Sequence, residues 1–277
     1  MVTNETASFY RRIDETTFRP TEHAQGVWRP TEQHMGPASG LLTHALETAF
    51  PREDVQLCRI SFDILGVIAA EDTTVEVELR RPGRTIEMLE ARLEVGGRTA
   101  IRATGWRLAR ADTTVVAGGA ADPLPNPEAW PSWRLDSDWQ GGYISTLDGR
   151  AHPESEPGRA QAWLRTNTTL IEGERVSDLV DFTTLVDTAN GVGARVPPRD
   201  WMFPNTDLTI HYFRTPSFSG SDPDDRWVGF DTTATFGPDG VGLTSSALFD
   251  AHGQVGRAEQ ILTVRRMPGT SRSEAIR

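Results

Sequence analysis

One order of predicted elements occurs twice in this chain, and this repetition restricts the possible folds more than any other feature. Residues 20–110 and residues 160–266 each predict a strand, a helix and then three strands. In each half a glycine-containing turn divides the final strand pair, at Gly96-Gly97-Arg98 and at Gly253-Gln254, because hairpin turns favour residues that tolerate positive φ. The sequence therefore predicts two similar α+β layers that pack together, with a cleft between them.

The boundaries of these elements follow from the alternation of apolar and polar residues. In the first half they fall at residues 26–30, 35–50 (the helix), 57–68, 74–81 and 86–108. In the second half the same elements fall at residues 160–168, 176–190 (the helix), 206–214, 227–236 and 243–265. The chain thus divides into a first unit at residues 1–115, a proline-rich linker at 116–135, a second unit at 136–267 and a disordered tail at 268–277.

Three tryptophans lie at and just beyond the end of this linker. Trp130, Trp133 and Trp139 fall within ten residues of one another. Such a cluster favours packing of the connection against a core, and stacking on a ligand is the alternative.

The basic residues of the chain exclude several classes of enzyme. All 28 are arginines, and the chain contains no lysine. Schiff-base and pyridoxal-phosphate enzymes, Walker-type phosphate loops and Ser-Lys dyads are excluded, since each requires a lysine. The net charge of −11, with scattered arginines, argues against a nucleic-acid partner.

The sequence also lacks the signals of a membrane or secreted protein. No apolar run approaches the about 20 residues that a membrane-spanning helix needs. Residues 1–10 have neither the basic start nor the apolar core of a signal peptide. Cys58 is the only cysteine, so no intrachain disulfide can form. We therefore expect a cytoplasmic protein.

Familiar catalytic and metal-binding motifs are missing. The nearest approach to a Gly-x-Ser-x-Gly nucleophile motif, around Ser39, has the wrong spacing and lies at a helix start. The six histidines form no HExxH pattern or other close ligand pair. The sequence therefore predicts neither a metal nor another cofactor.

The best candidate for acid–base chemistry is Asp187, near the end of the second predicted helix. An apolar stripe at helical spacing runs from Val176 to Ala189, and Asp187 lies beside it before Asn190-Gly191, which is expected to end the helix. The negative end of the helix dipole, together with burial, would raise the pKa of this carboxyl group and suit a general base. A solvated carboxylate that only flanks the stripe is an equal alternative.

Two further polar features lie on predicted strands. Gln260 falls on the apolar face of the last strand, where its amide must hydrogen-bond to the backbone or serve a ligand. Asn205-Thr206-Asp207 opens the strand that follows the helix bearing Asp187. These residues form either an ordinary turn or a group that holds a water or a carbonyl oxygen.

The whole chain, from about residue 20 to residue 266, resembles the acyl-CoA thioesterases of the tandem, or double, hotdog fold, which include bacterial thioesterase II. In a hotdog, a curved antiparallel sheet wraps a long helix. The residues that carry the resemblance are Gln33-His34-Met35-Gly36-Pro37 in the first half and, in the second, Val186-Asp187-Thr188-Ala189-Asn190-Gly191, Asn205-Thr206-Asp207-Leu208-Thr209 and Arg257-Ala258-Glu259-Gln260.

The resemblance implies hydrolysis of acyl-CoA or a related acyl thioester without a cofactor. In the family an Asp, a Thr and a Gln bind and activate water. Asp187 and Gln260 match two of these residues, and either Asn205 or Thr206 takes the place of the third. Backbone N–H groups near Gly36, at the start of the first helix, are expected to stabilise the oxyanion.

The resemblance also suggests contacts for the rest of the substrate and for a partner. Arg80, Arg81 and Arg84 are candidate contacts for the CoA phosphates, although an exposed hairpin with ordinary solvated charges explains them equally well. Hotdog sheets often join edge to edge across a two-fold axis, so a homodimer is expected by analogy.

Two other functions remain open at this stage. Asp207-x-x-x-His211 resembles a motif of hotdog enoyl-CoA hydratases and dehydratases, but its spacing is one residue short and the Asn-Pro is missing. A non-catalytic protein that binds acyl thioesters is the second alternative, because Asn205 occupies the position of the family's threonine.

Overall fold

The computed structural model describes residues 7–137, 139–218 and 225–268. In the first half, α1 (Met35–Thr48) packs against the sheet strands β3 (Val55–Ile64), β4 (Thr73–Arg81), β5 (Ile86–Val95) and β6 (Arg98–Ala109). Two short strands, β1 (Ser8–Arg12) and β2 (Thr17–Pro20), precede the helix. These elements confirm the predicted helix and the predicted strands that follow it.

The second half repeats this order. The main elements are β9 (Arg159–Thr166), α3 (Asp178–Val186), β12 (Asp207–Tyr212), β13 (Val228–Phe236), β14 (Val241–Asp250) and β15 (Gly253–Thr263). Shorter pieces are β7 (Ser132–Trp133), α2 (Gly142–Ser145), β8 (Leu147–Ala151), β10 (Thr169–Ile171), α4 (Ala189–Val192), β11 (Trp201–Met202) and β16 (Arg265–Arg266).

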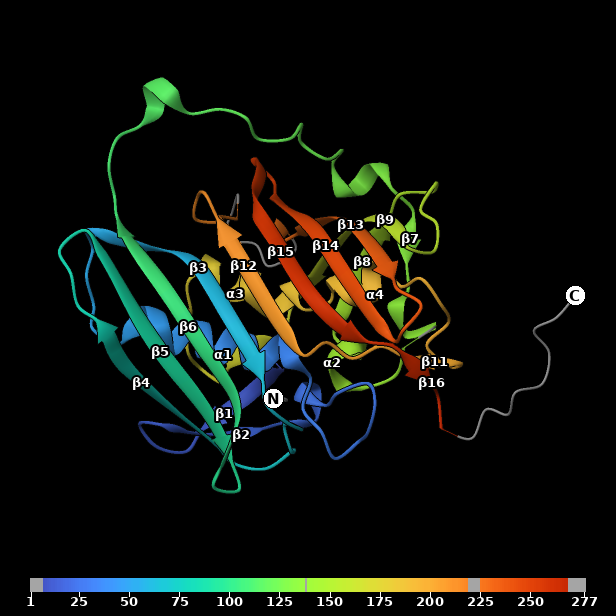
Figure 1. The fold of residues 1–277 in the computed structure, drawn as a ribbon, viewed down its shortest axis with the longest axis horizontal. Coiled ribbons are helices and arrows are strands. Elements are labelled where there is room, and N and C mark those ends of the chain that lie inside the picture. The colour runs from blue at the N-terminus through green and yellow to red at the C-terminus, as the bar shows by residue number, and fades with distance from the viewer. Residues whose placement is uncertain (1–6, 138, 219–224, 269–277) are drawn as a thin grey trace, which may run out of the picture.

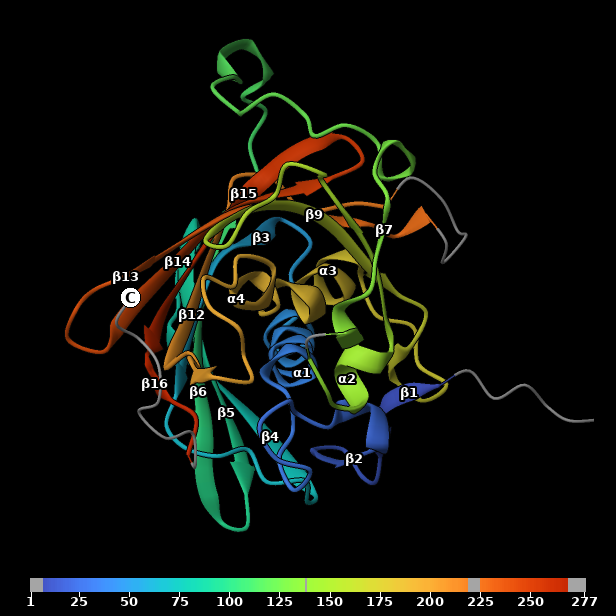
Figure 2. The same ribbon diagram turned by 90° about the vertical axis from the view of Figure 1, so that its right-hand side faces the viewer.

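The two halves share one curved sheet (Figure 1). β3 of the first half pairs antiparallel with β12 of the second, with Asp63 opposite Asp207 and Arg59 opposite His211. At the far side, β1 pairs in parallel with β10. Figure 2 shows α1, α3 and α4 within the concave side of this sheet. The halves are therefore one body, with a common core beneath the sheet.

The two long helices cross closely because α1 carries small residues at the contact. A Cβ atom at Gly36 would lie 2.7 Å from the carbonyl oxygen of Thr184, and one at Gly40 would collide with the Thr184 hydroxyl. Ser39 also donates a hydrogen bond to the carbonyl of Thr183, at 3.2 Å. The N-terminus of α1 is thereby fixed beside the C-terminal end of α3.

Several sequence predictions about elements need correction. Residues 26–30 are not a strand: the N–H of Gly26 donates to the carbonyl of Glu32, at 2.7 Å, so this segment folds back as a loop. The predicted second helix does not continue to Asn190, because the carbonyl of Leu185 accepts from the N–H and hydroxyl of Thr188, which closes a tighter turn. α3 ends at Val186, and α4 runs through Gly191.

The predicted glycine turns are confirmed, with φ of 58° at Gly96, 72° at Gly97 and 113° at Gly253. The linker runs along one edge of the molecule (Figure 1), and the carbonyl of Pro125 accepts a hydrogen bond from the Trp163 indole, at 2.8 Å. Beyond Pro268, the predicted tail lies outside the described residues. None of the helices within the described ranges is long and apolar enough to cross a membrane.

Candidate active site

Asp187 lies at the C-cap of α3 and is only 3% exposed. Its Oδ1 accepts two hydrogen bonds, from Nδ2 of Asn205 at 2.9 Å and from Nε2 of Gln260 at 3.0 Å. The structure thus brings together three residues that are well separated in the sequence. Of the two candidates for the third position, Asn205 contacts this carboxylate, and Thr206 is exposed.

Strand geometry explains how Asn205 and Gln260 reach the carboxylate. Gln260 is 1% exposed and points inward from β15 with its neighbours Ala258 and Leu262, as the alternation predicts. Asn205 pairs with Leu262 in an isolated bridge just before β12 begins. Both amides therefore approach Asp187 from neighbouring chain segments in the middle of the sheet.

Burial controls the protonation of Asp187. It raises the pKa of this carboxyl group from its ordinary value of 3.8 to about 6, against the opposing effect of the hydrogen bonds from Asn205 and Gln260. A carboxylate with this pKa is ionised at neutral pH and yet accepts a proton readily, which suits a general base.

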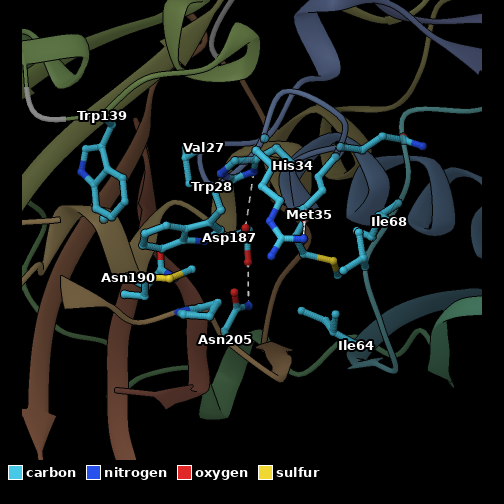
Figure 3. Close-up of a pocket in the computed structure, with 18 of the residues that line it drawn as sticks. Val27, Trp28, His34, Met35, Ile64, Ile68, Trp139, Asp187, Asn190 and Asn205 are labelled. Atoms are coloured by element: carbon cyan, nitrogen blue, oxygen red, sulfur yellow. Dashed lines mark hydrogen bonds and ion pairs between the residues drawn. The ribbon is translucent and has the colours of Figure 1, made fainter. Parts of the chain in front are cut away.

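The second carboxylate oxygen has a different neighbour. Oδ2 of Asp187 lies 3.5 Å from Nδ1 of His34, and Figure 3 shows Asp187 between His34 and Asn205. Because Oδ1 takes both amide donors, Oδ2 remains available, among the described residues, to accept a proton from a water molecule.

His34 is held rigidly at the start of α1. It is the N-cap residue, and its Nδ1 accepts a hydrogen bond from the N–H of Gly36 at 3.0 Å. The imidazole stacks on Tyr143, with ring centroids 4.2 Å apart and an interplanar angle of 26°. Tyr143 in turn donates to the carbonyl of Thr184, at 2.8 Å. Burial lowers the pKa of His34 to about 3, so this imidazole is neutral.

These groups border a pocket of about 390 Å³, within the range of small-molecule sites. One side is apolar and aromatic: the ring centroids of Trp28 and Trp139 lie 5.6 Å apart, edge to face, and both pack on Phe203. His34 and Asp187 line the same pocket, and Figure 3 shows Asp187 between Trp28 and Ile68. Behind Trp139 and Gly191 lies a second pocket, of about 570 Å³, which these two residues also line.

Several predicted site residues do not reach this pocket. Thr206 is exposed, and its N–H donates to the carbonyl of Ile261, because adjacent residues of an extended segment point to opposite sides. Gln260 contacts Asp187 but does not line the pocket. The N–H of Gly36 is already bonded to His34, so it does not present a free oxyanion donor.

The predicted arginine cluster lies at the opposite end of the first half-sheet. The β4–β5 turn, which holds Arg81 and Arg84, is level with the first residues of β3, whereas the site adjoins its last residues. At about 3.3 Å per residue this corresponds to roughly 20 Å or more. Arg80 is paired with Glu78 and Glu90. The arginines that line the pocket are instead Arg29 and Arg265.

The pair suggested for a hydratase also lies elsewhere. Asp207 accepts a hydrogen bond from the N–H of Ile261, at 2.7 Å, and His211 is exposed on the same side of β12. Neither side chain lines the pocket that contains Asp187. The arrangement does not support hydratase chemistry at these residues.

Sequence reasoning missed His34 as a pocket residue, although it lay within a quoted motif. Histidine is not among the residues that commonly cap a helix, so nothing in the sequence marked His34 as the N-cap. The stacking of Tyr143 on His34 also had no signal in the sequence. Trp139 was expected to pack the linker against a core, with stacking on a ligand as the alternative. It lines the pocket, whereas Trp130 packs with Trp163 and Phe249.

Comparisons with known proteins show the family of this chain. The N-terminal domain of acyl-CoA thioesterases matches residues 24–108, and their C-terminal domain matches residues 120–264. The chain belongs to the acyl-CoA thioesterase family. Membership makes this protein a thioester hydrolase. No curated protein sequence matches this acyl-CoA thioesterase significantly.

Solved structures share the fold at low sequence identity. An acyl-CoA thioesterase II, TesB2, from Mycobacterium marinum has 16% identity and a TM-score of 0.64, over 95% of this chain and 96% of the other. A protein described as thioesterase II from Thermobifida fusca has 16% identity and a TM-score of 0.68, over 94% and 96%. A hot dog protein of unknown function from Alicyclobacillus acidocaldarius has 13% identity and a TM-score of 0.71, over 94% and 97%. These likenesses establish the α+β double hotdog fold.

Proposed function

We propose that this thioesterase hydrolyses acyl-CoA, or a related acyl thioester, by general-base catalysis at Asp187. The observation that carries the proposal is the asymmetry of the carboxylate. Asp187 lines the pocket, and its Oδ1 is held by Asn205 and Gln260, while its Oδ2 accepts no hydrogen bond from the described residues. One oxygen fixes the orientation of the group, and the other is left to take a proton.

The reaction follows from this arrangement. Oδ2 accepts a proton from water as the water oxygen attacks the thioester carbonyl carbon, which forms a tetrahedral oxyanion. When the oxyanion collapses, the carbon–sulfur bond breaks. The proton held by Asp187 passes to the leaving thiolate, so the products are a carboxylic acid and a thiol, and Asp187 returns to its ionised form.

The walls of the pocket suggest how the substrate lies. We place the acyl group against Trp28 and Trp139, which line the pocket and pack on Phe203 behind them, because apolar surface is buried there. We place the CoA portion toward Arg29 and Arg265, whose guanidinium groups can bind phosphate. The Arg29 side chain remains 70% exposed, as a contact for a solvated nucleotide would be.

The proposal is tested by thiol release from acyl-CoAs of increasing chain length, with the wild type and Asp187→Asn side by side. Turnover by the wild type, its loss in the variant and retained binding of acyl-CoA are expected. Thr206→Ala is the matched control, because Thr206 lies next to Asn205 but faces away from the site. Full activity of Asp187→Asn would disprove the role of this carboxylate.

A further inference from the structure

The hydrogen bonding of His34 fixes which of its nitrogens carries the proton. Nδ1 accepts from the N–H of Gly36, at 3.0 Å, so it cannot itself hold a hydrogen on that side. A neutral imidazole carries one proton. The proton of His34 is therefore on Nε2, and the backbone at the start of α1 selects this tautomer.

Nε2 of His34 is left as an open donor. This nitrogen makes no hydrogen bond within residues 7–137, 139–218 and 225–268, although His34 lines the pocket and 12% of its side chain is accessible. An N–H group that borders a pocket without a partner is suited to a ligand oxygen. Stacking on Tyr143 keeps the ring, and hence this N–H, in one orientation.

The charge state of the ring suits such a donor as well. Burial lowers the pKa of His34, and its position at a helix N-terminus also disfavours a positive charge. A neutral imidazole N–H beside a helix N-terminus can polarise a carbonyl, as in triosephosphate isomerase, where a neutral histidine acts as the electrophile. His34 and Asp187 line the same pocket, so the donor and the proposed base belong to one site.

We propose that His34 is a catalytic residue that donates its Nε2–H to the thioester carbonyl oxygen and stabilises the tetrahedral oxyanion. This rests on the proposed hydrolysis at Asp187 and adds the group that receives the developing charge. In this proposal Nε2–H of His34 takes the role that the sequence analysis gave to the N–H of Gly36. The N–H of Gly36 instead donates to Nδ1 and holds the imidazole in place. The donor comes from the first half of the chain and the base from the second.

Two substitutions separate this role from helix capping. His34→Asn supplies an oxygen near the position of Nδ1, so it still caps α1, but it has no donor at the position of Nε2. His34→Gln reaches the position of Nε2 with an amide N–H but caps α1 poorly. If Nε2–H stabilises the oxyanion, His34→Asn should keep the melting temperature of the wild type and lose about 100-fold to 1,000-fold in kcat.

His34→Gln should show the reverse pattern, with a lower melting temperature and a kcat at least about 10-fold above that of His34→Asn. The assay is thiol release from the best acyl-CoA, with thermal unfolding of each variant and of Asp187→Asn. The donor role would be overturned if His34→Asn kept a kcat within about threefold of the wild type. It would also be overturned if kcat fell in proportion to melting temperature in both variants. In that case Asp187→Asn would still be inactive. If the wild type hydrolyses no acyl-CoA, the proposed function fails and the donor role fails with it.

Discussion

Asp187→Asn should stabilise the folded protein at neutral pH, although it removes the proposed base. Burial raises the pKa of Asp187 from 3.8 to about 6 on folding. The folded protein therefore binds this proton more tightly than the unfolded chain does. The protonated Asp187 therefore adds to the free energy of unfolding. This contribution is fully present below pH 3.8 and is lost as the pH rises through about 6. The loss is about 3 kcal/mol, from about 2 pKa units at about 1.4 kcal/mol each.

The amide of the variant escapes this penalty because it fits the existing contacts. Its oxygen can accept from Asn205 and Gln260, as Oδ1 does now. Its NH2 group, which carries no net charge, would then take the place of the present Oδ2, 3.5 Å from Nδ1 of His34. For a chain of this length, an unfolding entropy of about 0.6 kcal/mol per kelvin converts about 3 kcal/mol into a rise of about 5 °C in melting temperature.

The measurement is thermal unfolding of the wild type and the variant, followed by circular dichroism between pH 4 and pH 8. We expect the full difference at pH 8 and little of it at pH 4, because Asp187 is already protonated there in the folded state. The exposed Asp239→Asn is the control and should change the melting temperature equally at both values. The argument would be refuted if Asp187→Asn melted below the wild type at pH 8. It would also be refuted if the two melting temperatures differed by the same amount at pH 4 and at pH 8.

Three other predictions concern catalysis. First, kcat/KM should rise with pH along a limb centred at about 6, as Asp187 loses its proton, and a pH–rate profile without this limb would exclude Asp187 as the base. Second, Asn205→Ala removes a hydrogen bond to a charged group, worth about 1.5–3 kcal/mol, and should lower kcat/KM by about 10-fold to 100-fold, whereas Thr206→Ala should stay near wild type. Third, Trp139→Ala should join the pockets of about 390 and 570 Å³ and shift the preference in an acyl-CoA panel to longer chains. Trp133 borders only the second of these pockets, so Trp133→Ala should leave the chain-length preference unchanged.

The elements that the sequence predicted correctly are those specified by local patterns. Alternation placed Gln260 on the inner side of the last strand, and paired glycines marked the turn at Gly96-Gly97. The errors arose where a tertiary contact overrides the local pattern. Val27 and Trp28 have the composition of a strand but form a loop beside the pocket, since that loop is closed by a backbone hydrogen bond.

The site was only partly predictable, for a similar reason. Asp187, Asn205 and Gln260 could be proposed because short motifs contained them. The stacking of His34 on Tyr143 could not, because the two residues lie far apart in the sequence and meet only when the halves pack. The arginine cluster was misplaced because spacing within a hairpin does not reveal which end of the sheet borders the site.

The geometry of the site depends on how the two halves are joined, and this links the fold to the chemistry. α1 supplies His34, and the end of α3 supplies Asp187. Their separation is set by the close crossing of the two helices, where Gly36 leaves room for both the carbonyl of Thr184 and the ring of Tyr143. A side chain at Gly36 would push α1 away from Thr184 and Tyr143 and would so displace the imidazole relative to the carboxylate. The role of this glycine is therefore to permit close packing. The repeat of one α+β unit thus provides two helix ends that lie close together, with the proposed base at the end of α3 and the proposed hydrogen-bond donor at the start of α1.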